Sequence, residues 1–226
     1  MPKAYLISDC HLNHSNIKTW CQRPDDFTDR IDRNVLNTLK PGDTLLNLGD
    51  FGIGDVEGYV NTAKRWKAYG IKHILVRGNH DQKSPLWYMD NGFDFACDMM
   101  VFRGCLLTHK PWMGELPDGV HVNLHGHLHN VWSGFLPTDP EKEQEEFVYA
   151  AKNGKLLRDF HRLFAVEYTD YRPVEFDKFV SKPDKYQARR PNKPLVSSVP
   201  DATGSDFSGL NEIGGGMVLR ECTRED

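Results

Sequence analysis

Five short segments of the chain combine aspartate, histidine and asparagine in a way that could bind metal ions. They are DCH (9–11), GD (49–50), GNHD (78–81), TH (108–109) and HGHLH (125–129). Oxygen ligands mixed with imidazole nitrogens suit Mn, Fe, Zn or similar divalent ions, and because no cysteine is needed among them a structural zinc site is disfavoured. They offer more ligands than one ion requires, whereas two ions about 3.5–4 Å apart that share a carboxylate would use them all.

The segment NLHGHLHN (123–130) places His125, His127 and His129 at alternating positions. Side chains alternate between the two faces of a strand, so an extended segment would place all three imidazoles on one face. Buried imidazoles need a partner, and a metal ion is the commonest one; a solvated, histidine-rich loop tip is the alternative.

Each segment alone has an ordinary explanation. Asp-x-His occurs by chance, Gly-Asp after a strand is usually a turn, and a single His109 is usually a core or surface histidine. Together, in this order and each at the end of a predicted strand, the segments indicate a metal site.

The elements that must position these residues alternate between strand and helix. Strands are predicted at 4–9, 44–50 and 73–81, a hairpin at 101–110, a further extended segment at 121–130, and helices at 30–39 and 56–69. Gly70 closes the second helix. Such alternation predicts an α/β layered fold, in which ligands bind beyond the carboxyl ends of the strands.

The later part of the chain reads differently. Residues 131–160 are predicted to be a surface insertion, since their charged stretch at 137–159 lacks a clear apolar face. Alternation returns at 162–176, which predicts a closing strand. From residue 181 the composition shifts to Pro, Lys, Arg, Ser and Gly, which predicts an extended or disordered tail after a domain of residues 1–180.

Bulk composition excludes several classes of protein. The chain has 226 residues and a net charge of −4, which disfavours a protein that coats nucleic acid. Neither a signal peptide nor an apolar run long enough for a membrane helix is found. Five scattered cysteines without a C-x-x-C pair suit reduced thiols, so we expect a cytoplasmic protein without a membrane partner.

The order D-x-H, G-D, G-N-H-D, H, G-H-x-H over residues 9–129 resembles the calcineurin-like metallophosphoesterase superfamily. The opening DCHLNHSNI is similar to that of its small stand-alone bacterial and phage members. The resemblance implies a four-layered α/β/β/α sandwich with a di-metal site at the carboxyl ends of the strands.

The resemblance also implies roles for individual residues. The first ion would be bound by Asp9, His11 and His129, the second by Asn79, His109 and His127, with Asp50 as the bridging carboxylate. His80 would meet the substrate phosphate and the leaving group, and Asp81 could hold its imidazole in the useful tautomer. For His125 a supporting or packing role is favoured over substrate contact.

By the same resemblance the chain hydrolyses phosphoesters. Two divalent ions, with Mn favoured and Fe, Zn, Ni or Mg as alternatives, would provide a bridging hydroxide that attacks phosphorus. His80, as imidazolium, would stabilise or protonate the departing oxygen.

A small nucleotide-type or cyclic phosphodiester is the favoured substrate. The segment FGIGD after Asp50 lacks the arginine that grips a phosphomonoester in the protein phosphatases of the superfamily, and GNHD replaces their GNHE. Candidate substrate contacts are Asn13, His14, Arg23 and Arg77. Arg77 has a surface salt bridge as its plain alternative, and His14 a helix cap.

Other functions stay open. A phosphomonoesterase is the first alternative. A nuclease with a nucleic-acid partner is less favoured, because the chain has little room for further domains, and an inactive binding scaffold is less favoured, because every ligand of the motif set is kept. The order of the motifs does not suit a di-metal amidohydrolase.

Overall fold

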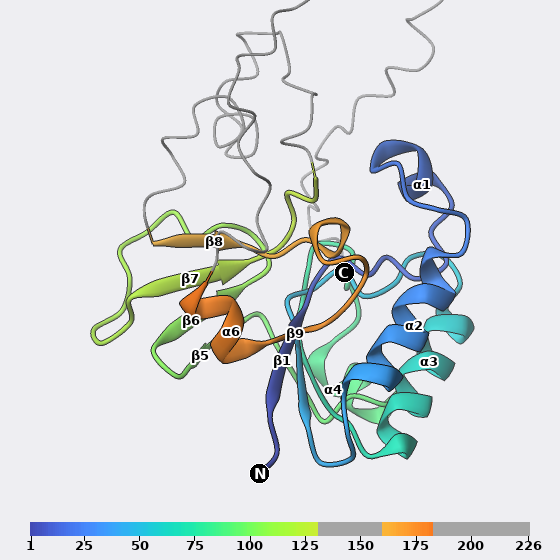
Figure 1. The fold of residues 1–226 in the computed structure, drawn as a ribbon, viewed down its shortest axis with the longest axis horizontal. Coiled ribbons are helices and arrows are strands. Elements are labelled where there is room, and N and C mark those ends of the chain that lie inside the picture. The colour runs from blue at the N-terminus through green and yellow to red at the C-terminus, as the bar shows by residue number, and fades with distance from the viewer. Residues whose placement is uncertain (131–159, 183–226) are drawn as a thin grey trace, which may run out of the picture. The chain divides into compact units, whose positions relative to one another are not determined.

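The computed structural model of the chain describes residues 1–130 and 160–182, which form two β-sheets and several helices (Figure 1). The first sheet has the order β4-β3-β2-β1-β9, and its strands are β1 (Ala4–Ile7), β2 (Thr44–Asn47), β3 (Lys72–Val76), β4 (Phe95–Cys97) and β9 (Val174–Glu175). The second has the order β5-β6-β7-β8, with β5 (Met99–Phe102), β6 (Cys105–Thr108), β7 (Val122–His125) and β8 (His161–Leu163). The helices are α1 (Asn16–Trp20), α2 (Phe27–Thr38), α3 (Val56–Tyr69), α4 (Pro85–Asp90), the 3-10 helix η3 (Val166–Tyr168) and α6 (Phe176–Ser181).

Parallel pairing dominates both sheets. Strands β1 to β4 run parallel to one another, and β9 pairs antiparallel with β1. In the second sheet β6, β7 and β8 are parallel, and β5 forms an antiparallel hairpin with β6. The predicted α/β fold class is therefore confirmed, and the carboxyl ends of β1, β2 and β3 emerge at one edge of the first sheet.

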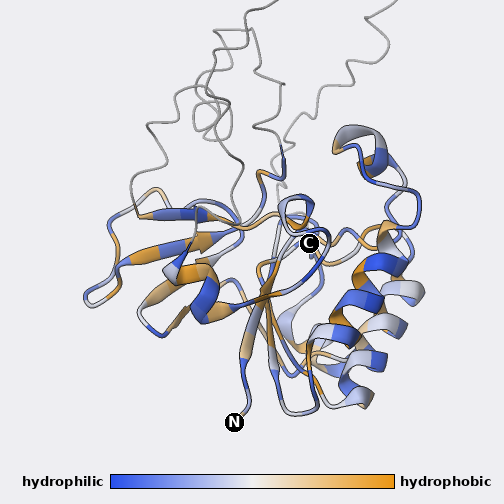
Figure 2. Cartoon of the chain, viewed as in Figure 1, coloured by the Kyte–Doolittle hydropathy of each residue, from blue (hydrophilic) through white to orange (hydrophobic). Residues whose placement is uncertain are grey.

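The central strands of the first sheet are buried and consist mainly of apolar residues. Every residue of β1 is buried, as expected for a central parallel strand covered on both faces. Helices α2 and α3 cover the outer side of this sheet (Figure 1). Hydrophobic residues concentrate along the strands, whereas hydrophilic residues line the outer side of the two helices (Figure 2). The Trp66 indole N–H donates to Asp32 at 2.7 Å and ties α3 to α2.

Helix α3 has the bounds that the sequence predicts. Asp55 caps its N-terminus by accepting a hydrogen bond from the Gly58 N–H at 2.9 Å. Gly70 ends it with a left-handed φ of 99°. The predicted hairpin is likewise confirmed, with Met99 opposite Thr108.

The predicted closing strand at 162–176 is wrong. The segment forms β8 and β9, which lie in different sheets, with η3 between them. Phe164, Ala165 and Val166 are all buried, so the chain here is not a one-sided strand, and Asp170 and Tyr171 then turn it with φ of 53° and 58°. This crossing from one sheet to the other brings Glu167 close to the candidate site.

Within the described ranges, no helix has the length and apolar character needed to cross a membrane. The chain divides into two units, residues 1–190 and 191–226, and all described residues belong to the first. The predicted surface insertion and tail lie outside the described residues, apart from Phe160 and the last residues of α6 and its cap.

Candidate metal centre

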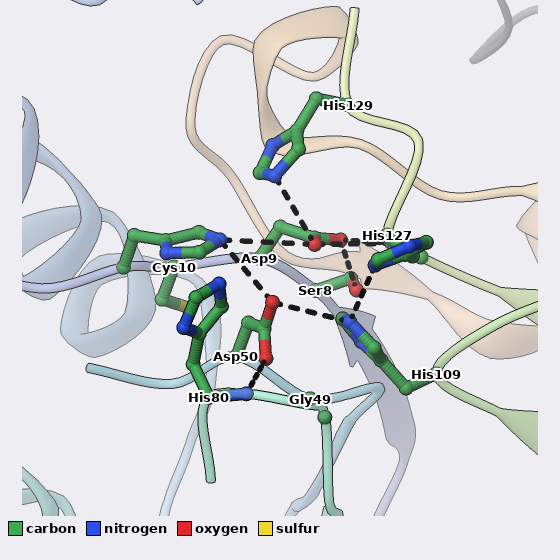
Figure 3. Close-up of polar contacts among 12 residues, drawn as sticks. Ser8, Asp9, Cys10, Gly49, Asp50, His80, His109, His127 and His129 are labelled. Carbon is green, nitrogen blue, oxygen red and sulfur yellow. Dashed lines mark hydrogen bonds and ion pairs between the residues drawn. The ribbon is translucent and has the colours of Figure 1, made fainter. Parts of the chain in front are cut away.

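The candidate ligands follow the ends of five strands. Asp9 and His11 come after β1, Asp50 after β2, Asn79 after β3, His109 after β6, and His127 and His129 after β7. Backbone hydrogen bonds join these loops: the Asp9 N–H donates to the Gly49 carbonyl at 2.9 Å, and the His127 N–H donates to the Asp9 carboxylate at 3.0 Å. Figure 3 shows the side chains from both sheets pointing toward one another.

The first group of ligand atoms comes from Asp9, His11 and His129, and these atoms lie within 4.8 Å of one another. The His129 Nε2 lies 3.6 Å from the Asp9 Oδ1, and the His11 Nε2 lies 4.0 Å from the same oxygen. Both ring nitrogens of His11 are buried, and neither has a hydrogen-bond partner among residues 1–130 and 160–182. A buried imidazole in this condition fits a metal ligand, because a bound cation would satisfy the nitrogen that faces the carboxylates.

In the second group of ligand atoms, three side chains lie close to the Nε2 nitrogen of His109. The His109 Nε2 lies 3.1 Å from the Asp50 Oδ2, 3.1 Å from the Asn79 Oδ1 and 3.2 Å from the His127 Nδ1. An imidazole nitrogen carries at most one hydrogen, so it cannot serve three neighbours at once. A divalent cation amid these lone pairs would satisfy all of them. The Asp50 Oδ2 is also 3.5 Å from the His11 Nε2, which places this carboxylate between the two groups.

Neighbouring polar groups orient several of these side chains. The His109 Nδ1 lies 2.8 Å from the Leu48 carbonyl, so this nitrogen carries a hydrogen and Nε2 faces the site. The Ser8 hydroxyl donates to the Asp9 Oδ2 at 2.5 Å. The His129 Nδ1 lies 3.4 Å from the Glu167 Oε1. Sequence reasoning missed all three supporting groups; only Glu167, an acid within an otherwise apolar segment, carried a signal.

Arg23 supports the site from beneath instead of facing a substrate. Its guanidinium donates to the Glu167 Oε1 at 2.7 and 2.9 Å, to the Asp9 carbonyl at 2.7 Å and to the Cys10 carbonyl at 2.8 Å. The side chain is buried. Arg23 therefore holds the loop that carries Asp9, which corrects its interpretation as a substrate contact.

The hydrogen bonds agree with the plain alternative for Arg77, an ion pair, and correct the role expected of Asp81. Arg77 donates to the Lys83 carbonyl at 2.8 Å and pairs with Asp98, so its charge is used away from the metal groups. Asp81 does not hold the His80 imidazole: both of its oxygens accept backbone N–H groups, including that of Asp50 at 2.7 Å.

Of the remaining predicted substrate contacts, His80 and His14 lie next to the candidate ligand His11, whereas the Asn13 side chain binds a different residue. The His80 N–H donates to the Asp50 Oδ1 at 2.8 Å (Figure 3). The His80 ring lies 5.5 Å from that of His11, centroid to centroid. His14 lies 5.7 Å from His11 in the same measure. Asn13 instead donates to the Asp55 carboxylate at 3.2 Å.

The charges of the site compensate one another. Burial by itself raises the pKa of Asp50, but the hydrogen bond and positive charge of His109 outweigh it and hold that pKa well below its usual range. Burial lowers the pKa of His109, yet Asp50 and Asp9 raise it overall to about 9. Burial and the His109 charge lower the pKa of His127 to about 3. The buried carboxylates of Asp9 and Asp50 therefore stabilise positive charge at this position, which is the property that a cation site requires.

Backbone strain concentrates in the same loops. Five candidate ligands have left-handed φ angles: Asp9 (53°), His11 (45°), Asp50 (53°), His127 (71°) and His129 (48°). Such conformations are uncommon for residues other than glycine, cost about 1–3 kcal/mol each, and cluster at functional sites. No sequence signal revealed them.

The glycines of the motifs leave room for the carboxylates. A Cβ on Gly78 would lie 2.2 Å from the Asp50 Oδ1, and one on Gly126 would lie 1.9 Å from the Ser8 Oγ and 2.3 Å from the Asp9 Oδ2. Any larger residue at these positions would displace a candidate ligand.

The idea of three histidines on one face of a strand is wrong. Strand β7 ends at His125, and the positive φ of His127 and His129 turns their side chains into the site. His125 is fully buried, and its ring packs 5.7 Å from that of His161. This agrees with the packing role expected for it.

The chain is similar to a family model, to a protein from an archaeon and to solved structures. A family model described as calcineurin-like phosphoesterase matches residues 2–184. The uncharacterized protein MJ1445 of Methanocaldococcus jannaschii is 26% identical over 197 residues, 82% of this chain and 93% of that protein. The solved structure of AQ665 from Aquifex aeolicus, a protein of unknown function, has a TM-score of 0.55 and 25% identity, covering 80% of this chain and 99% of its own. The nuclease MPE of Pseudomonas putida has a TM-score of 0.39 and 25% identity over 56% of this chain and 61% of that one.

Proposed function

The chain belongs to the calcineurin-like phosphoesterase family, and from this premise we propose that it is a phosphodiesterase acting on a small nucleotide-type or cyclic diester. Metal-dependent hydrolysis of phosphoesters is the activity that the family supports. The preference for a diester, the metal and the role of each residue are parts of the proposal, and each has its own support.

Two sets of residues hold the metal ions in this proposal. Asp9, His11 and His129 would hold one ion, and Asn79, His109 and His127 would hold the other; Asp50 would be available to both. Oxygen and imidazole ligands without a thiolate favour Mn, with Fe, Zn, Ni and Mg as alternatives. Two such ions supply water of lowered pKa and neutralise the charge that develops on the phosphate oxygens.

His80 is the proton donor to the leaving oxygen. It belongs to neither group of candidate ligands, yet its N–H donates to Asp50 and its ring lies 5.5 Å from the His11 ring. An imidazole beside the metal centre can reach an ester oxygen of a bound phosphate and donate a proton to it. His14, whose ring also lies next to His11, is the second candidate for a substrate contact.

The observation that favours a diester is that both nearby arginines form ion pairs with carboxylates of the protein. A phosphomonoester carries nearly two negative charges and a diester only one, so a monoesterase gains more from an additional cation. Arg23 is neutralised by Glu167 and Arg77 by Asp98, so neither is available to grip a second charge.

Hydrolysis of bis(p-nitrophenyl) phosphate and of p-nitrophenyl phosphate tests the proposal. Metal-stripped protein resupplied with Mn²⁺ is expected to prefer the diester, and Asp50→Ala is expected to remove the activity. Metal content measured by mass spectrometry identifies how many ions each protein retains.

Each other outcome points to one alternative. Preference for the monoester would replace the proposal with a phosphatase. Bound metal without activity on either compound would indicate a narrower substrate, and a protein that binds no metal would indicate an inactive scaffold.

A further inference from the structure

A cavity of about 200 Å³ lies beside the candidate metal centre. It is lined by Gly52, Ile53, Gly54, Val56, Tyr59, His80, Gln82, Lys83 and Tyr88. These residues come from the loop after β2, the start of α3, and the segment from His80 into α4. Sequence reasoning assigned none of them a role except His80.

His80 is the residue that joins this cavity to the metal centre. Its backbone N–H donates to Asp50, and the same residue lines the cavity. A proton donor must lie within hydrogen-bond distance of the oxygen it protonates, about 2.6–3.2 Å. The group attached to that oxygen therefore begins at His80 and extends along the wall that His80 shares.

The size of the cavity fits one arm of a substrate. Sites for a whole drug-sized ligand span about 300–1,000 Å³, so a smaller cavity accommodates a part of such a molecule, on the scale of a base with its sugar. Gly54 contributes to this space, because a Cβ there would find no atom within 4 Å.

The lining has both apolar and hydrogen-bonding character. Ile53 and Val56 provide aliphatic surface, the largely buried Tyr59 and Tyr88 add aromatic atoms to the wall, and Gln82 has an amide group that can donate and accept. A flat ring with a hydrogen-bonding edge, such as a nucleobase, matches this combination better than a sugar or glycerol, which has no apolar face of that size.

The charge of the rim favours an uncharged arm. Lys83 is the lysine of the described lining, and its Nζ lies 5.9 Å from the Trp87 ring centroid. Asp55, between Gly54 and Val56 in the chain, places a carboxylate beside the same loop. A second phosphate would face the Asp55 carboxylate as well as Lys83, and His80 is already used by the leaving oxygen, so such a phosphate would gain little.

We propose that this cavity binds the leaving alcohol of the diester and that this alcohol is a nucleoside. The reaction adds one water: its oxygen forms a new bond to phosphorus, the bond from phosphorus to the nucleoside oxygen breaks, and His80 gives that oxygen a proton. The proton released from the water returns to solvent, from which His80 is reprotonated. The inference rests on the proposed function.

Two diesters that differ only in the leaving alcohol test it. Thymidylyl(3′→5′)thymidine releases thymidine, and the methyl ester of thymidine 3′-phosphate releases methanol, an alcohol of similar acidity. The metal-loaded full-length protein is expected to show a kcat/KM higher for the first by on the order of tenfold or more, since binding one base on aromatic and apolar surface contributes that much. Chromatography of the products identifies which alcohol leaves.

Variants tie the preference to the cavity. Val56 is 40% exposed at the start of α3, so Val56→Trp can fold while its indole fills the cavity, and the ratio between the two diesters is expected to fall toward one. Val101→Trp, at a 52% exposed position of β5, is the matched control and is expected to keep the ratio. Equal rates for the two diesters in the wild type, or an equal rate for the glycerol ester of thymidine 3′-phosphate, would overturn the proposal while leaving the phosphodiesterase function intact.

Binding of thymidine to the full-length protein as purified tests the cavity independently of phosphoester hydrolysis. Saturation-transfer NMR is expected to detect thymidine on the wild type and on Val101→Trp but not on Val56→Trp. If no phosphoester is hydrolysed, the proposed function fails, and this binding measurement still decides whether the cavity accepts a nucleoside. Absence of binding to the wild type would overturn the inference.

Discussion

The carboxylate of Asp81 accepts a hydrogen bond from the backbone N–H of Asp50 at 2.7 Å. The same carboxylate accepts the N–H groups of Phe51 at 3.2 Å and Gly78 at 2.8 Å. One buried side chain therefore joins the loop after β2 to the loop after β3. Its function is to position the proposed bridging carboxylate, although the sequence placed it beside His80.

Asp81→Asn is expected to weaken this junction. The amide group has one acceptor oxygen in place of two, so at least one buried backbone N–H loses its partner, which destabilises the protein by about 1–3 kcal/mol. Urea unfolding measures the loss, and calorimetric titration with Mn²⁺ is expected to show weaker binding. Asp90→Asn, at an exposed position at the end of α4, is the control. Full metal affinity in Asp81→Asn would show that this junction does not position Asp50.

Glu167→Gln is expected to lower metal affinity without touching a ligand. Burial alone raises the pKa of Glu167, but Arg23 and His129 lower it to about 2, so the side chain is ionised at neutral pH. A carboxylate that orients a ligating histidine contributes about 10–100-fold to metal affinity. Mn²⁺ titration measures this effect.

The same substitution leaves the buried Arg23 without its counterion, so a loss of stability of up to about 3–5 kcal/mol is expected as well. Glu175→Gln is the matched control, because Glu175 pairs with Lys3 and Lys178 near the surface, where an ion pair contributes about 0–1 kcal/mol. Equal metal affinities in the two variants would show that Glu167 does not orient His129.

His80→Asn is expected to separate chemistry from metal binding. Loss of a general acid lowers kcat by about 10²–10⁴-fold, whereas the candidate ligands remain in place. Steady-state kinetics on a diester measure the first effect, and metal content by mass spectrometry measures the second. If the variant loses metal in proportion to activity, His80 acts as a ligand and the proposed role is incorrect.

The sequence was informative where residue type alone carries the chemistry. Asp9, Asp50 and His109 were identifiable because each follows an apolar strand and parallel strands bring their carboxyl ends to one edge. Helix α3 was predictable from Asp55 and Gly70, whose capping roles depend on local chemistry.

Features that arise from contacts distant in sequence were not predictable. His127 and His129 have left-handed φ, whereas a period-2 pattern assumes an extended backbone, and the His127 N–H donates to Asp9, 118 residues earlier in the chain. Glu167 reaches His129 only because the chain crosses between sheets after β8. Arg23 and Arg77 were assigned to the substrate because a sequence shows a charge but not the carboxylate that neutralises it.

His73 is expected to make the stability of the protein fall in mild acid. It is fully buried against Phe51, Trp66 and Phe93, and burial lowers its pKa from 6.5 to about 3. Between these values the unfolded chain binds a proton that the folded protein does not. The free energy of unfolding therefore decreases as the pH falls, by about 1.4 kcal/mol per pH unit, and the contribution is fully present above pH 6.5.

Urea unfolding between about pH 4 and pH 7.5 measures this slope for the wild type and for His73→Phe, in which the ring is kept and the titration removed. The variant is expected to lose stability less steeply, whatever its stability at neutral pH, because the slope depends only on proton uptake. Other buried histidines such as His125 contribute equally to both proteins and cancel in the comparison. His121→Gln, at an exposed position, is the control and is expected to keep the slope of the wild type. Parallel curves for the wild type and His73→Phe would mean that His73 takes up a proton in the folded protein as readily as in the unfolded chain.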